Sequence, residues 1–213
     1  MQFTNNDFQD IMLHRHSVRH FDSSVKIPRD ELQQMVQEAI TAPSSCNLQA
    51  WHFVVVDTPE GKDKLRSFFM KFNLPQLDSC SAMIMVFGDT DAFKKYRALW
   101  QKMYTEHQIT KERLDEILQT FLPLYEHADK QFLTADALID SSLAAMQLLL
   151  TIRAHGYEAN PLGGYDAKKA ATALGLDPNR YVPALGIAVG KPDPNAHEIT
   201  SERYAVQDVL EFQ

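Results

Sequence analysis

The segment TADALIDSSLAAMQLLLTIRAHGYEANPLGG, residues 134–164, decides how the rest of this chain is organised. Its first part is apolar at almost every position, which is the pattern of a helix that its neighbours cover on all sides. Thr134 can cap the start of this helix, and Asp136 suits the positive end of its dipole. Arg153 followed by Gly156 is typical of a helix end. The sequence therefore predicts a long central helix.

The central helix leads into the loop NPLGGY, residues 160–165. Two adjacent glycines allow backbone amides to approach a ligand or a neighbouring segment closely. A Gly-Gly pair on its own more often marks a simple tight turn, so the rest of the chain has to decide between these two interpretations.

Length and composition exclude several classes of protein. The 213 residues, with 45% hydrophobic and 23% charged, suit one soluble domain spanning 1–213. A formal net charge of −7 argues against a nucleic-acid partner, which needs clustered Lys and Arg in excess. Cys46 and Cys80 provide neither a disulfide framework nor a zinc site, and they fit a reducing cytoplasm. The N-terminus has no signal-peptide layout, and no stretch approaches the roughly 20 apolar residues of a membrane span. We therefore expect a cytoplasmic protein without a membrane partner.

Helix and strand patterns surround the central helix. Apolar residues at helical spacing predict helices at residues 5–14, 28–40, 58–72 and 166–174. β-Branched and apolar runs predict strands at residues 52–57, 82–88 and 182–189. Helix pairs together with strand–helix alternation favour an α+β fold in which helices flank a mixed sheet. Three strands are few for a complete sheet, so we expect the missing strand to come from the C-terminal tail or from a partner chain.

Residues 91–133 form a separate aromatic-rich stretch that predicts two further helices. The aromatic residues are suited to a helical lid over a flat ligand, with Tyr104, Phe121 and Tyr125 as candidates for substrate contact. Spacings of three and four are more often those of core residues, so a role in the core stays open as the alternative.

Several familiar sequence signatures are absent from the chain. No GxGxxG follows a strand, and there is no P-loop, HExxH or GxSxG. These absences argue against a Rossmann dinucleotide site and against a serine hydrolase.

The first polar signal is RHSVR, residues 15–19, directly after the first helix. Two guanidinium groups and a hydroxyl are the donor set that binds a phosphate or an electron-rich oxygen. In extended backbone Arg15, Ser17 and Arg19 point to one side. A solvated basic turn is the simpler interpretation. Metal binding by His14, His16 and His20 is disfavoured, because no carboxylate or Cys cluster accompanies them.

The second polar signal is APSSCNLQAW, residues 42–51, between a predicted helix and a predicted strand. Ser44, Ser45, Asn47 and Gln49 place many donors and acceptors on a loop that rigid elements flank. Such a composition is also that of an ordinary turn.

Together, and in this order, these segments resemble the nitroreductase family of FMN-dependent oxidoreductases. The similarity covers nearly the whole chain and continues through FNLPQ at 72–76, NPLGGYD at 160–166, VPALGIAVGKPD at 182–193 and an arginine near the C-terminus. One such segment would be a weak signal, but the set in the family's order is specific.

The resemblance implies an intertwined homodimer of α+β subunits with two FMN molecules at the interface. The central helix would lie at the dimer centre, and the C-terminal tail would cover the partner. The flavin phosphate would bind Arg15, Ser17 and Arg203, with His16 in the same segment. The resemblance also places Arg19 at the N1 and C2 carbonyl edge of the flavin and Asn73 at its ring. The backbone of Leu162, Gly163 and Gly164 would reach the N5 edge. The neighbouring subunit would contribute Pro43, Ser44, Ser45 and Asn47.

The activity implied by the resemblance is that of an FMN-dependent NAD(P)H oxidoreductase. NAD(P)H would deliver a hydride to the flavin, and a small electron-poor acceptor such as a nitroaromatic or a quinone would then take two electrons. Arg19 would stabilise the negative charge of the reduced flavin, and no side chain is predicted as an acid or base. Dehalogenation, enoate reduction or flavin breakdown on the same fold, and a non-catalytic flavin-binding redox sensor, remain as alternatives.

Two positions depart from the family's usual pattern. Ser201 stands where a lysine is common, which removes one cation from the expected phosphate site. Ala50 stands where proline is common, which leaves the loop before Trp51 less restricted. Neither change removes a group that the redox chemistry needs.

Overall fold

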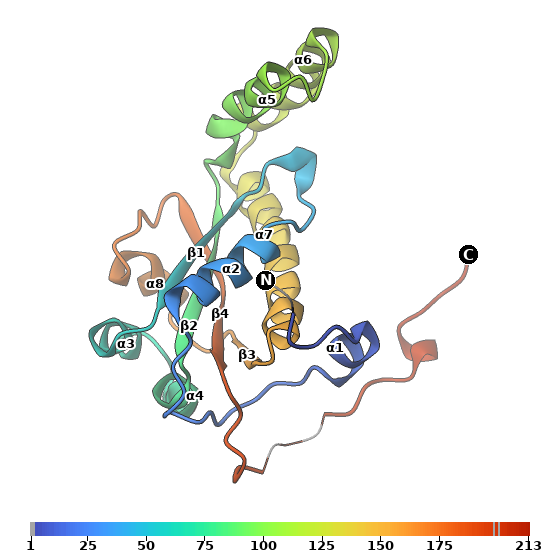
Figure 1. The fold of residues 1–213 in the computed structure, drawn as a ribbon. Helices are drawn as coiled ribbons and strands as arrows, with labels where there is room; N and C mark the ends of the chain where they lie inside the picture. The colour runs from blue at the N-terminus through green and yellow to red at the C-terminus, as the bar shows by residue number, and fades with distance from the viewer. Residues whose placement is uncertain (1–2, 198, 200) are drawn as a thin grey trace.

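One four-stranded sheet forms the centre of the protein, whose computed structural model describes residues 3–197, 199 and 201–213 (Figure 1). Its strands are β1 (Trp51–Val56), β2 (Ala82–Asp89), β3 (Glu158–Leu162) and β4 (Tyr181–Gly190), in the spatial order β1-β2-β4-β3. All three neighbouring pairs run antiparallel. The α+β class is confirmed, but the sheet is antiparallel rather than mixed. Strand–helix alternation suggested parallel crossovers, whereas the helix that follows β3 returns the chain to an antiparallel neighbour.

The missing fourth strand comes from neither source that we expected. It is β3, which contains Pro161 and occupies the end of the sheet beside β4. Proline is tolerated there because an edge strand needs hydrogen bonds on one side only. We did not predict this strand because the composition of NPLGG, residues 160–164, is typical of a turn.

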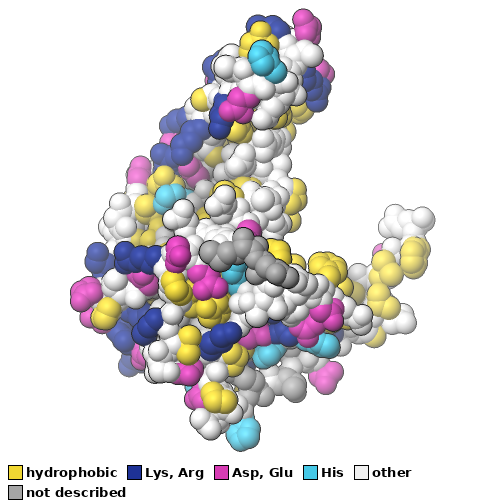
Figure 2. All heavy atoms as spheres, viewed as in Figure 1, with side chains coloured by type: hydrophobic (Ala, Val, Ile, Leu, Met, Phe, Trp, Pro, Cys, Tyr) yellow, Lys and Arg dark blue, Asp and Glu magenta, His cyan; other side chains and the backbone are white. Residues whose placement is uncertain are grey.

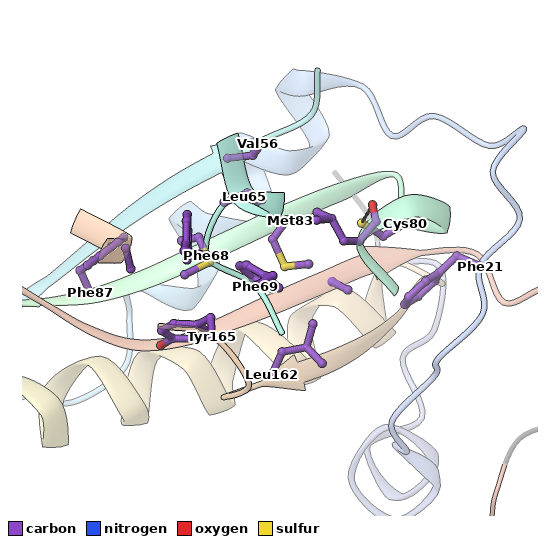
Figure 3. Close-up of a cluster of buried hydrophobic side chains, with 14 of the residues drawn as sticks. Phe21, Val56, Leu65, Phe68, Phe69, Cys80, Met83, Phe87, Leu162 and Tyr165 are labelled. Atoms are coloured by element: carbon purple, nitrogen blue, oxygen red, sulfur yellow. Dashed lines mark hydrogen bonds between the residues drawn. The ribbon is translucent and has the colours of Figure 1, made fainter. Parts of the chain in front are cut away.

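Helices cover the sheet on both faces (Figure 1). Along β2 the side chains alternate, so that Ile84 packs with α2 (Arg29–Ala39) and α7 (Lys130–Ala154). Met83 and Met85 face the opposite layer, which is built by α3 (Pro59–Arg66), α4 (Leu74–Ser79) and α8 (Ala167–Ala173). Figure 3 shows this second core, where Phe68, Phe69, Tyr165 and Leu162 gather over the sheet.

The central helix is confirmed as α7, but it begins earlier than predicted. Asp129 caps it by accepting a hydrogen bond from the Phe132 amide, so Thr134 and Asp136 lie inside the helix rather than in its first turn. Its apolar surface is not covered on all sides within one chain. Ile139, Leu143 and Met146 are 57%, 43% and 45% exposed and form one stripe.

By length and composition alone, α7 is also apolar enough to cross a membrane, which corrects the expectation that no stretch of this chain is. Half of its most apolar window is buried against the rest of the fold, as in the core helix of a globular protein. α7 therefore belongs to the packed core described above.

The other predicted helices occur in the predicted order with shorter limits, whereas α4 was not predicted. α1 spans Phe8–His14, and Thr58 caps α3 by accepting from the Gly61 amide. The predicted helix at 58–72 ends at Arg66, and Phe72 beyond it is 67% exposed. Short 3-10 turns lie at Ser45–Asn47, Lys71–Asn73, Ala92–Lys95 and Val206–Asp208.

The segment 91–133 contains the two predicted helices, α5 (Tyr96–Thr105) and α6 (Lys111–Glu126), which project from the body of the molecule (Figure 1). At their base Tyr96 and Tyr125 are buried with Ala137 of α7. These aromatic residues therefore serve as core, as the alternative interpretation held. The C-terminal tail extends away from the body, with apolar side chains exposed along it (Figure 2).

Candidate functional site

The segment Arg15–Arg19 lies beside β3. Ser17 forms a parallel bridge with Ala159, and the Val18 amide donates to the Ala159 carbonyl at 3.2 Å. Val18 is fully buried, whereas Arg15, Ser17 and Arg19 are half-buried on the other side of the extended backbone. Their shared direction is as the sequence predicted.

Arg15 and His16 face Ser201 and Arg203 across a cleft of about 430 Å³. The Arg203 guanidinium donates to the Ser201 hydroxyl at 2.8 Å. Within the described part of the chain, neither Arg15 nor Arg203 pairs with a carboxylate. Two guanidinium groups without a carboxylate partner and a hydroxyl in one cleft match the chemistry of a phosphate dianion. The structure thus brings Arg15, His16 and Arg203 together.

A partly buried ion-pair network lies beneath this segment. Arg153 of α7 donates to Asp10 at 2.9 Å and also pairs with Glu158 of β3. Hydrogen bonds from His14 and Asn5 lower the pKa of Asp10 to about 2, with Arg153 adding to the effect. Burial raises the pKa of Glu158, while Arg153, His16 and Arg15 oppose that rise. The network ties α1 to α7 and β3, and so fixes the backbone from which Arg15 emerges.

The glycine pair lies between β3 and the helical turn at Asn73. The Asn73 side-chain amide donates to the Gly164 carbonyl at 2.9 Å, which brings together two of the predicted site residues. A Cβ on Gly164 would lie 2.3 Å from Asn73 Nδ2, so this glycine is required by close approach. Gly163 has open space where its Cβ would be, and Leu162 contributes its side chain to the core.

The second polar loop has an unusual backbone. Cys46, Asn47 and Gln49 have φ of 50°, 62° and 54°, in the left-handed region that non-glycine residues rarely occupy. Pro43 is exposed, while Ser44, Ser45 and Asn47 are half-buried. This loop is not the ordinary turn that its composition allowed.

Two carboxylates of α7 hold this loop in place. Asp140 accepts hydrogen bonds from the backbone amides of Ser45, at 2.8 Å, and Ala50, at 3.2 Å. Asp136, one turn earlier, accepts from the Ser45 hydroxyl at 2.6 Å. We did not identify this role from the sequence. The available signal was a pair of acidic residues four positions apart in an otherwise apolar helix.

The two groups of predicted site residues lie at opposite corners of the sheet. Ser17 is aligned through Ala159 and Val189 with Ala82 at the start of β2, whereas Ala50 bonds Asp89 at its end. These positions are roughly 23 Å apart along the strands, and β1 and β3 are roughly 14 Å apart across the sheet. One chain therefore does not bring all the predicted site residues together.

Comparisons with known proteins agree on the family. The sequence profile described as "Nitroreductase family" matches residues 12–191. The chain belongs to the nitroreductase family. It is 61% identical over 187 residues to the CLA biosynthesis enone reductase of Lactiplantibacillus plantarum, covering 88% of this chain and 86% of that protein. It is also 38% identical to the protein called "Putative NAD(P)H nitroreductase YdgI" of Bacillus subtilis, over 98% of both chains.

A solved structure extends this similarity to three dimensions. The protein of Exiguobacterium sibiricum described as a "putative nitroreductase in complex with FMN" is 36% identical, with a TM-score of 0.93 over 100% of both chains. FMN is the cofactor of the nitroreductase family. The predicted family and class, an FMN-dependent NAD(P)H oxidoreductase, are therefore confirmed.

Proposed function

We propose that this nitroreductase-family protein is an enone reductase that uses FMN and NAD(P)H. The net reaction would consume NAD(P)H and a proton, convert the C=C bond conjugated to a ketone into a saturated bond, and release NAD(P)⁺. When bound, FMN would supply the two-electron redox chemistry, while the protein would supply orientation and charge. The observation that carries the proposal is the 61% identity to the enone reductase of Lactiplantibacillus plantarum.

A second candidate is the reduction of a nitroaromatic or a quinone, as we first expected. The 38% identity to a protein with a nitroreductase name favours it. The higher identity to an enone reductase makes C=C reduction the better hypothesis.

We assign the cofactor-binding roles as the family resemblance implied. Arg15, Ser17 and Arg203, with His16 beside them, would hold the phosphate, and the cleft between Arg15 and Arg203 supports this role. Arg19 would act as the electrostatic stabiliser of the flavin. Asn73 and the backbone at Leu162, Gly163 and Gly164 would hold the ring, and their mutual contact supports a shared surface.

We also propose that two copies of the chain complete each site. Pro43, Ser44, Ser45 and Asn47 would then contact the flavin from the neighbouring subunit. The opposite-corner arrangement of the two groups supports a contribution from a second chain. The exposed stripe Ile139, Leu143 and Met146 would pack at the dimer centre. The tail, with exposed Val209 and Phe212, would cover the partner.

Residues 1–213 would act as one cytoplasmic unit, with 91–133 as a lid over the acceptor. The projection of α5 and α6 from the body supports the lid.

Anaerobic turnover with matched acceptors tests the function. The FMN-loaded protein is given NADH or NADPH with benzylideneacetone, nitrofurazone or menadione, and products are identified by mass spectrometry. We expect the enone to gain two hydrogens at its C=C bond, with kcat/KM at least about tenfold above that for the nitroaromatic. The saturated ketone of the same skeleton is the control and should not be consumed.

The opposite ranking would support the second candidate and overturn the enone assignment. Binding of FMN without NAD(P)H consumption for any acceptor would favour a non-catalytic flavin protein. Size-exclusion chromatography with light scattering tests the dimer, and a monomer that turns over with full FMN occupancy would contradict the shared site.

A further inference from the structure

We propose that the Asp140 carboxylate is a positioning residue, which fixes the shape of the cofactor-facing loop at residues 43–50 and thereby its grip on FMN. The inference rests on the proposed function, because it takes this loop to contact the flavin. Asp140 is fully buried, so it would act on the cofactor only through the loop.

One carboxylate binds the loop at two points, Ser45 and Ala50. Asp140 is 0% exposed, its Oδ1 accepts from the Ser45 amide and its Oδ2 accepts from the Ala50 amide. An ionised carboxylate is an acceptor at both oxygens, so it satisfies two inward-facing backbone donors at once. The neutral Asn side chain of the same size has only one acceptor oxygen and carries an NH2 donor in place of the other.

The backbone between these two anchors needs such support. Cys46, Asn47 and Gln49 all occupy the left-handed region without being glycine. Residues in this region persist where the surroundings over-determine their conformation. The Ser44 hydroxyl accepts from the Gln49 amide at 3.1 Å inside the loop. The α7 carboxylates join the Ser45 end of this stretch to a rigid helix, while the Ala50 end is also bonded by the Asp89 amide of β2 at 3.0 Å.

The surroundings of Asp140 are not those of a stabilising ion pair. Among the residues that the structure describes, no Lys or Arg pairs with it, and the titratable groups that face the loop beside it are Asp136, Cys46 and Tyr125. Burial raises the pKa of Asp140, and the neighbouring Asp136 adds to that rise. A buried carboxylate without a cation opposes folding unless its hydrogen bonds compensate. The buried carboxylate of Asp140 is therefore better explained by its hydrogen bonds to the loop than by a charge partner.

Asp140→Asn in the full-length protein tests this inference directly. The substitution keeps the shape but turns one acceptor into a donor that faces a backbone amide. Asp89→Asn is the matched control, because Asp89 is also buried and its carboxylate binds Arg180 at 2.7 Å rather than the loop. FMN affinity is measured by quenching of flavin fluorescence. Hydrogen–deuterium exchange of residues 43–50 is measured without FMN.

We expect Asp140→Asn to speed exchange in residues 43–50 and to weaken FMN binding at least about tenfold, which is about 1.4 kcal/mol. Asp89→Asn should lower Tm but leave FMN affinity within about twofold. The inference is overturned if exchange in the loop is unchanged, or if both variants lose FMN affinity equally. A wild-type protein that binds no FMN would overturn the proposed function and the cofactor half of this inference, whereas the exchange data would still decide whether Asp140 holds the loop.

Discussion

Two corners of the sheet are built in opposite ways: the Arg15 corner, which comprises residues 15–19 with Ser201 and Arg203, and the Ser45 corner, which comprises residues 43–50. At the Arg15 corner the backbone is regular, next to β3, and the open features are the Arg15 and Arg203 guanidinium groups, which pair with no carboxylate among the described residues. At the Ser45 corner the side chains are small and neutral, and the backbone itself is unusual, held by buried carboxylates of α7.

If both corners bind FMN as proposed, they would recognise the cofactor in two different ways. Charge on long side chains suits the phosphate end, since it tolerates small errors in position and is sensitive to salt. A backbone of fixed shape suits a flat, neutral ring, since it offers donors and acceptors at set places. The corners should therefore respond differently to substitution.

The largest effect is expected at Arg19. Its charge should act on the rate of flavin reduction, whereas the charge of Arg15 should act on FMN binding, so equal behaviour of the two residues would contradict the comparison. Arg19→Ala should slow anaerobic flavin reduction by about 100-fold, because a fixed positive charge toward the developing negative charge is lost. FMN affinity should change less than this rate. Stopped-flow absorbance measures the rate per bound FMN.

Arg113→Ala on α6 is the control for this experiment, since Arg113 is an exposed cation paired with Glu116. Simple loss of FMN from Arg19→Ala, with an unchanged rate per bound cofactor, would contradict the electrostatic role.

Arg203 should show the next largest effect, and it sharpens the contrast between charge and shape. Arg203→Ala should weaken FMN binding by about 10- to 100-fold, since a charge-assisted bond to phosphate is lost. The affinity of the variant should also depend less on salt. Titration at several NaCl concentrations measures both, with riboflavin, which lacks the phosphate, as the control ligand. An equal loss of riboflavin affinity would argue against a phosphate contact.

The Arg15 corner was predictable from the sequence because its signal is chemical. In a run of Arg, His and Ser, the residue types themselves identify the hydrogen-bond donors, and the structure keeps Arg15, Ser17 and Arg19 on one side of the extended backbone. The central strand and the helix beside it were predictable for a similar reason, since the apolar run of β2 and the helical spacing in α2 are both visible in the local sequence.

The Ser45 corner was less predictable because its shape depends on residues distant in the sequence. Composition identified the loop, but Asp136 was interpreted through the helix dipole and Asp140 was not interpreted at all. Only the packing of α7 against the sheet brings them beneath Ser45, over 90 positions away in the chain. β3 was missed because Pro161 and the glycines are locally typical of a turn, and only its edge position makes them acceptable.

The glycine pair between the two corners provides a smaller and more specific test. Gly164→Ala should lower Tm by several degrees and the free energy of unfolding by about 1–3 kcal/mol, because its Cβ would displace Asn73 and the Phe72 ring. Gly163→Ala is the matched control and should leave the Tm of the FMN-free protein unchanged, since open space surrounds its Cβ position. Calorimetry without FMN measures both.

The same pair reports on the cofactor when FMN is added. If the flavin lies against Gly163, the Gly163→Ala variant should bind FMN several-fold more weakly despite its normal stability. Unchanged affinity in that variant would argue that the N5 edge does not approach Gly163.

The smallest effect is expected at Ser201, where this chain departs from the family's common lysine. Ser201 lines the same cleft as Arg15 and Arg203, so Ser201→Lys should return a third cation to the phosphate site. An exposed charge of this kind should tighten FMN binding by about two- to fivefold at low salt. Ser201→Met, which adds length without charge, should not. Equal tightening by both variants would assign the gain to apolar contact, and the Arg15 corner would then recognise its ligand by more than charge.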